Sequence, residues 1–169
     1  MHNLKSRLTY YIGDIVYGAN DGLITTFAVI AGASGAGFSS SVIIVLGIAN
    51  LIADGFSMGA SRYLSLKSEQ AVVGASQARN PFNDGIATFV AFVLAGSLPI
   101  LPFLMPHFAE NAFQTALIAT GVAFFLVGAA RSFVIKKSPL TAGLEMLLVG
   151  GFASAIAYGL GSWVETLIR

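Results

Sequence analysis

The 169-residue chain has no cysteine, and only 10% of its residues are charged. The first absence excludes disulfides and metal sites built from thiolates. The few charged residues nearly balance, with a net charge of +1. This gives no indication of nucleic-acid binding, and we expect no such partner. Histidine occurs only as His2 and His107. A soluble enzyme rich in ionisable groups is therefore not indicated.

Hydrophobic residues make up 56% of the chain, and they gather in five segments of about 20 residues, the length that about 30 Å of hydrocarbon requires. Prolines lie before the third and fifth segments and cluster where the third one ends. We therefore expect an all-α, polytopic protein with one membrane domain over residues 1–169, lying in the lipid bilayer. The predicted transmembrane helices cover 15–36, 41–63, 84–105, 112–133 and 142–164.

Lysine and arginine predict the orientation, because they are enriched on the cytoplasmic side of short loops. With five spans, eight of the nine fall on one side and only Arg169 falls on the other. The amino terminus is therefore expected in the cytoplasm and the carboxyl terminus on the far side. The eight are Lys5, Arg7, Arg62, Lys67, Arg79, Arg131, Lys136 and Lys137.

Two aspartates lie inside the first two apolar segments, where an ionisable side chain indicates a functional site. Asp21 is about 9 Å from the cytoplasmic edge and Asp54 about 13 Å, at 1.5 Å per residue. Their carboxylates are therefore predicted to face each other. Asp84 and Glu145 begin later spans on the same side, and the outer half of every span has no ionisable residue. A cation would thus be collected from the cytoplasm.

Asn50, Asp54 and Met58 follow at i, i+4 and i+8 and form one stripe on the second span. Amide and carboxylate oxygens suit hard cations, and a thioether shifts the preference toward Fe²⁺ and its neighbours. Together with Asp21, these residues are the candidate metal ligands. Met58 could instead be a packing residue. The aspartates could instead form a buried salt bridge with Arg62 or Arg131.

One copy supplies few ligands, so a twofold homodimer is expected to complete the site. Small residues at four-residue spacing let helices approach closely. They occur as Gly18 with Gly22, as Gly55 with Gly59, and along Gly151, Ala155 and Gly159. We assign the interface to the first two spans as a hypothesis.

The six residues from Asn20 to Thr25 are echoed by Asn83 to Thr88 at the start of the third span. The echo indicates either a duplication, which transporters often contain, or two similar helix starts.

The segments Asp14 to Phe27 (DIVYGANDGLITTF) and Asn50 to Ser61 (NLIADGFSMGAS) resemble the vacuolar iron transporter family. The resemblance implies a dimeric five-span carrier that exports or sequesters Fe²⁺ or Mn²⁺ from the cytoplasm by proton antiport. It also implies that Asp21 and Met58 are translocation ligands, with the metal as substrate and no permanently bound cofactor.

Two departures from the family pattern stand out. Many relatives have glutamate where this chain has Asn50, and we expect Asp54 to substitute for it. The second departure is that Glu69 is the only glutamate in residues 64–80. The chain therefore resembles a short form without the glutamate-rich cytoplasmic metal-binding domain.

Two other functions are compatible with parts of the sequence. Gly32 to Gly35 places Ser34 in a small-residue setting similar to that of an intramembrane serine protease, but no span offers a histidine as its base. We therefore expect no enzyme activity. A passive divalent-cation channel is the closer alternative. The compact chain without an added targeting segment favours a bacterial plasma membrane.

Overall fold

The computed structural model describes the backbone of residues 2–73, 79–135 and 137–168. This part of the chain is entirely helical apart from its turns, which confirms the all-α prediction. In chain order the helices are α1 (His2–Gly35), α2 (Ser40–Val73), α3 (Pro81–Ser97), α4 (Leu101–Leu104), the 3₁₀ helix η1 (Pro106–Asn111), α5 (Ala112–Ile135) and α6 (Pro139–Ile168).

Helix boundaries follow local chemistry. After α1, Gly37 has φ of +70°, and the amides of Gly37 and Phe38 donate to the carbonyls of Ser34 and Ala33. Glycine suits this left-handed position, which ends the helix and satisfies its last carbonyls. At the start of α3, the Asn80 side chain accepts from the amide of Phe82, and Pro81 occupies the first turn, where its missing N–H costs nothing.

Four helical segments are long and apolar enough to cross a membrane: Tyr11–Gly35, Ser40–Val72, Pro106–Ser132 and Pro139–Ile168. They correspond to four of the five predicted spans. The predicted third span differs, since α3 has only 17 residues and ends at Ser97. Pro99 lacks an amide hydrogen and cannot continue the helix, so the chain makes a turn before the one-turn α4.

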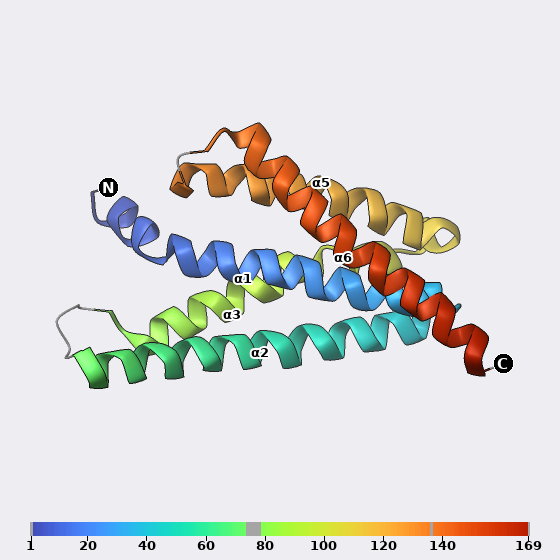
Figure 1. Ribbon diagram of the computed structural model, residues 1–169, viewed down its shortest axis with the longest axis horizontal. Helices are drawn as coiled ribbons and strands as arrows, with labels where there is room; N and C mark the ends of the chain where they lie inside the picture. The colour runs from blue at the N-terminus through green and yellow to red at the C-terminus, as the bar shows by residue number, and fades with distance from the viewer. Residues whose placement is uncertain (1, 74–78, 136, 169) are drawn as a thin grey trace.

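The helices lie roughly along one long axis, with α1 at the centre (Figure 1). α1 packs mainly against α3 on one side and α6 on the other, while α2 packs against α3 and α5 against α6. Leu23, Phe27 and Ile30 of α1 are fully or almost fully buried, as are Phe92 of α3 and Phe124 of α5. The two chain termini lie at opposite ends of the molecule (Figure 1).

Close glycine contacts hold α1 and α2 against α3. A Cβ at Gly18 would lie 2.5 Å from the carbonyl oxygen of Thr88. Gly59 and Gly85 approach each other so closely that a Cβ on either would come within 2.8 Å of the other's carbonyl oxygen. These glycines therefore serve packing within one chain and do not by themselves indicate a second copy. Gly151 and Gly159, by contrast, face open space.

Candidate metal-binding site

Asp21 on α1 and Asp54 on α2 lie close enough for their charges to interact, as the sequence predicted. Both side chains are partly exposed, although they lie in the middle of apolar helices. The hydroxyl of Thr25 donates to the backbone carbonyl of Asp21 at 2.8 Å. Thr25 is therefore bonded to its own helix.

The other two predicted ligands share the stripe of Asp54 on α2. Nδ2 of Asn50 is buried and has no hydrogen-bond partner among the residues that the structure describes. An unsatisfied buried amide is costly, so a partner outside this single chain would stabilise it. Met58 is partly buried and packs against the hydrophobic core. Its packing role is thus observed, whereas ligation stays a prediction.

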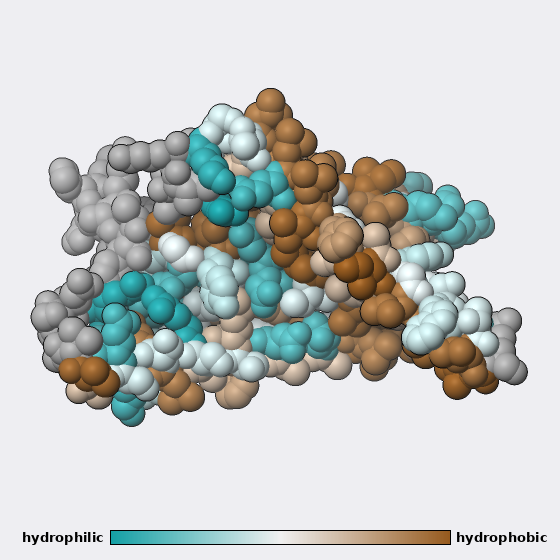
Figure 2. Space-filling model, in the orientation of Figure 1, coloured by the Kyte–Doolittle hydropathy of each residue, from teal (hydrophilic) through white to brown (hydrophobic). Residues whose placement is uncertain are grey.

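Hydrophilic surface extends from the end with the amino terminus into the middle of the molecule, between hydrophobic regions (Figure 2). α1 and α2 lie on this face, and their partly exposed polar residues include Asn20, Asp21, Asn50 and Asp54. Such a polar surface on apolar helices is unfavourable against lipid. It requires either water or another protein surface.

The predicted alternative, a salt bridge from Asp21 or Asp54 to Arg62 or Arg131, is wrong for the described residues. Arg62 instead pairs with Asp14 and approaches Asp84. Neither Asp21 nor Asp54 takes part in an ion pair with the described side chains, those of residues 11–72, 79–132 and 137–168. The two carboxylates are therefore not neutralised by any cationic side chain that the structure describes.

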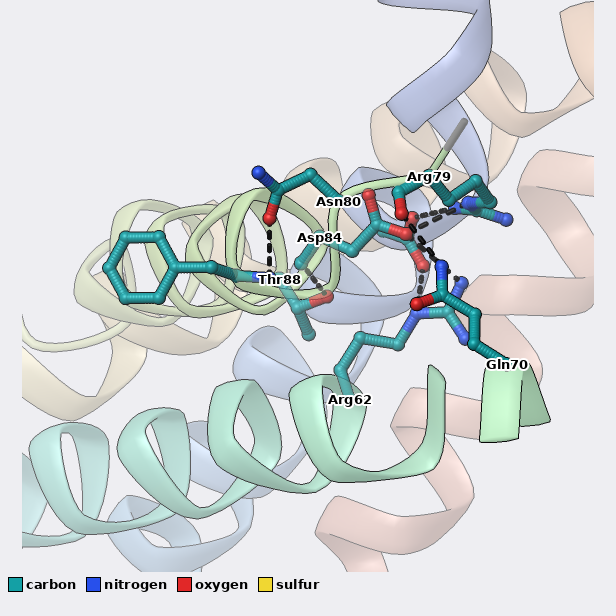
Figure 3. A network of polar contacts seen from close by, with 8 residues as sticks. Arg62, Gln70, Arg79, Asn80, Asp84 and Thr88 are labelled. Atoms are coloured by element: carbon teal, nitrogen blue, oxygen red, sulfur yellow. Dashed lines mark hydrogen bonds and ion pairs between the residues drawn. The ribbon is translucent and has the colours of Figure 1, made fainter. Parts of the chain in front are cut away.

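Four charged side chains form a closed ring of ion pairs, and Figure 3 labels three of them, Arg62, Arg79 and Asp84. Nε of Arg62 is 2.6 Å from Oδ1 of Asp14, and Nη2 of Arg79 is 2.6 Å from Oδ2 of the same carboxylate. Nε of Arg79 is 2.8 Å from Oδ2 of Asp84, and Nη2 of Arg62 is 3.8 Å from that oxygen. Gln70 also donates to the carbonyl of Arg79 at 2.7 Å. We call these four residues, Asp14, Arg62, Arg79 and Asp84, the ion ring.

The ion ring joins α1, α2 and the start of α3. Asp84 is fully buried and Asp14 is 6% exposed, so each carboxylate depends on the arginines for compensation. Two positive and two negative charges leave the ring neutral. It therefore fastens three helices together without attracting a cation.

The ion ring was not predicted from the sequence, which placed Asp84 with Glu145 at the cytoplasmic starts of later spans. Asp84 is instead enclosed, and Glu145 pairs with Lys137 at 3.2 Å on the surface. The sequence held one indication that Asp14 faces the interior. Asp14 precedes Asp21 by seven residues and so shares its helix face. The direction in which Arg62 and Arg79 point was not readable from sequence.

The two similar sequence segments, Asn20 to Thr25 and Asn83 to Thr88, also share a local hydrogen bond. Thr88 donates to the carbonyl of Asp84 at 2.9 Å, just as Thr25 does to that of Asp21. The surroundings of the two aspartates differ, since Asp84 belongs to the ion ring and Asp21 does not. Whether the echo reflects a duplication stays a prediction.

A single chain does not hold a complete acidic metal site in the described ranges. No group of three or more His, Asp or Glu side chains comes together there in a way that could hold a metal ion. Asp21 and Asp54 supply two carboxylates, and a divalent ion usually takes more oxygen ligands. Further ligands must come from Asn50, Met58, water or a second copy.

The fold and this site define a polytopic α-helical membrane protein with carboxylates inside its apolar helices. The sequence matches the VIT family over residues 12–80 and 72–162, so the chain belongs to that family. It is 27% identical over 210 residues to a vacuolar iron transporter of Centaurea cyanus, covering 88% of this chain and 86% of the relative. Vacuolar iron transporter 1 of Arabidopsis thaliana is 26% identical over 216 residues, covering 91% of this chain and 86% of the relative.

A third relative, a vacuolar iron transporter of Toxoplasma gondii, is 23% identical over 228 residues, covering 94% of this chain and 76% of the relative. These alignments are longer than the 169 residues of the chain, so the relatives contain residues that this chain lacks. The two family matches overlap at 72–80, within the segment 64–80 where the relatives are expected to carry a cytoplasmic domain that this chain lacks. Membership of this transporter family also confirms that the chain is not an enzyme.

Proposed function

We propose that this protein moves Fe²⁺, and also Mn²⁺, out of the cytoplasm in exchange for protons. The observation that carries the proposal is the pair Asp21 and Asp54, two interacting carboxylates inside apolar helices that no arginine of the described chain neutralises. Ionisable groups at such positions commonly mark ion pathways. The names of the relatives, vacuolar iron transporters, supply the metal.

The proposed topology has five membrane crossings with a cytoplasmic amino terminus. α3 and α4 together run between the two ends of the molecule, and the termini lie at opposite ends, as an odd number of crossings requires (Figure 1). Arg62, Arg79, Arg131 and Lys137 then fall on the cytoplasmic side, in agreement with the positive-inside rule. Metal therefore enters the site from the end that carries the ion ring.

The proposed site forms between two copies related by a twofold axis. Each copy contributes the carboxylates of Asp21 and Asp54, the amide of Asn50 and the thioether of Met58. Oxygen donors favour Mn²⁺ and Fe²⁺ alike, while the thioether adds preference for the softer ion. Pairing the α1 and α2 faces would also remove their polar surface from lipid.

Proton exchange follows from competition for the same oxygens. A carboxylate must be deprotonated to bind a metal ion, so binding releases protons and acid on the far side promotes metal release. Asp21 and Asp54 would thus carry a cation in one direction and protons in the other. The metal is the transported substrate in this scheme.

The experiment is metal flux into proteoliposomes containing a fluorescent metal indicator. Asp21→Asn keeps the size of the side chain but removes its charge, and we expect it to abolish Fe²⁺ and Mn²⁺ flux. Glu69→Gln is the matched control, because Glu69 is an exposed carboxylate near the cytoplasmic end of α2. It should transport normally. Normal flux through Asp21→Asn would refute the proposal.

A further inference from the structure

A groove with a volume of about 480 Å³ lies between α2 and α3, away from the metal-binding site. Its walls are apolar or aromatic, and glycines form part of its floor. Phe56, Ala60 and Tyr63 line it from α2, and Phe82, Ile86 and Phe89 from α3. Its size falls within the range of small-molecule and cofactor sites.

The groove follows α2 along the membrane normal. Tyr63 is 23 residues from Ser40, the first residue of α2, which corresponds to about 35 Å at 1.5 Å per residue. This is just beyond the roughly 30 Å hydrocarbon core, where tyrosine is enriched in membrane proteins. Phe56 lies about 10 Å deeper by the same measure. One end of the groove is thus at the level of the lipid headgroups and the other among the acyl chains.

A cation lies at the headgroup end of the groove. Lys67 is one turn beyond Tyr63, its Nζ donates to the Tyr63 hydroxyl at 3.3 Å, and it lies 5.5 Å from the centre of that ring. Lys67 forms no ion pair with any residue of the described ranges. Its positive charge is therefore available to an anion held above the groove.

The groove and the metal ligands lie on opposite faces of α2. On average, Phe56, Ala60 and Tyr63 point roughly 150° around the helix from Asn50, Asp54 and Met58 at 100° per residue. A second copy docked over the metal ligands therefore leaves the groove open to lipid.

We propose that this groove is a binding site for one anionic phospholipid of the cytoplasmic leaflet. An acyl chain lies along the aromatic wall formed by Phe56, Phe82 and Phe89. Lys67 binds the headgroup phosphate, as basic side chains at the cytoplasmic ends of membrane helices do for acidic lipids. The apolar wall alone would accept any lipid, so Lys67 provides the selectivity.

The test is native mass spectrometry of the delipidated full chain, titrated with phosphatidylglycerol or with phosphatidylcholine of identical acyl chains. The wild-type protein should bind phosphatidylglycerol about fivefold more tightly, the effect of one lysine near an anionic headgroup. Lys67→Gln should remove this preference, and Lys67→Arg should keep it. Ala60→Phe, which fills the groove, should weaken the binding of both lipids.

Two matched controls separate this site from general lipid contact. Lys137→Gln removes another cytoplasmic-side lysine, and Ala119→Phe adds the same ring at an exposed position of α5 outside the groove. Both should bind lipid as the wild-type protein does. Equal affinity of the wild-type protein for the two lipids would overturn the proposal. A preference that survives in Lys67→Gln would overturn it as well.

Discussion

Nε of Arg62, about three turns before the end of α2, lies 2.6 Å from Oδ1 of Asp14. Arg62 is two turns beyond Asp54 on the same helix, and a different side-chain direction would bring it toward the candidate metal site. The ion ring instead engages this guanidinium with Asp14 and Asp84. Arg62 is therefore not paired with Asp21 or Asp54, the two carboxylates of the proposed metal site.

Removing an arginine from the ion ring should destabilise the protein. Arg62→Met retains most of the apolar stem but leaves Asp14 and Asp84 with Arg79 alone. We expect the free energy of unfolding to fall by about 3 kcal/mol, because breaking a buried ion pair leaves a carboxylate uncompensated. Denaturant titration in detergent micelles would measure this loss. Lys137→Met is the control, since its exposed pair with Glu145 should be worth less than about 1 kcal/mol. Equal losses in both variants would contradict a structural role for the ring.

Gly18 should not tolerate a side chain. In Gly18→Ala the new Cβ would lie 2.5 Å from the carbonyl oxygen of Thr88, so α1 and α3 must separate. We expect a loss of about 1–3 kcal/mol, as for other overpacked contacts. Gly13→Ala on the same helix meets nothing within 4 Å and should be neutral or slightly stabilising. Thermal unfolding of both variants tests this, and a Gly18→Ala protein as stable as Gly13→Ala would exclude the tight contact.

Asp54 should substitute for the glutamate that the family resemblance implies at position 50. Asp54→Asn alone should abolish flux, because it removes one of the two carboxylates from each copy. The double variant Asn50→Glu with Asp54→Asn moves the carboxylate one turn along the same stripe and should recover part of the flux. Failure of the double variant, with normal expression and folding, would show that the site requires a carboxylate at position 54 itself.

Met58 has two roles that substitution can separate. Met58→Leu preserves the apolar volume against the core but removes the sulfur. If sulfur binds the metal, the ratio of Fe²⁺ flux to Mn²⁺ flux should fall severalfold while thermal stability is unchanged. Competition between the two metals in the same proteoliposomes measures that ratio. An unchanged ratio would leave Met58 as a packing residue alone.

Proton coupling distinguishes a carrier from a passive channel. In vesicles with an acidic lumen, outward proton flow should drive Fe²⁺ into the lumen above its external concentration, because protons displace the metal from Asp21 and Asp54 on the acidic side. A protonophore should abolish this accumulation. Equilibration without accumulation, unaffected by the protonophore, would identify a channel.

The sequence predicted the long helices well, because apolar length and proline position depend on local chemistry. The predicted span 112–133 lies within α5, Ala112–Ile135, and the predicted start of α3 differed by three residues because Pro81 is tolerated in the first turn. The shorter α3 was missed since the apolar composition continues through Pro99, where the backbone cannot remain helical.

Contacts between helices were harder to predict. The depths of Asp21 and Asp54 followed from counting residues, and the structure places the two close enough for their charges to interact. The partner of Arg62 depends on how α1, α2 and α3 are rotated about their axes, which no residue count provides. The same limit applies to Gly18, Gly22 and Gly59. Their spacing indicates a close neighbour, and only the structure shows that this neighbour is α3.

The opposite placement of the two termini constrains any attempt to join two copies into one polypeptide (Figure 1). With the proposed five crossings, and in a twofold pair with both protomers oriented alike, the end of the first would lie on the far side of the bilayer from the start of the second. A flexible tether cannot connect them, because its unpaired backbone groups would have to pass through hydrocarbon. A covalently linked tandem of this protein would need an extra helix as its connector.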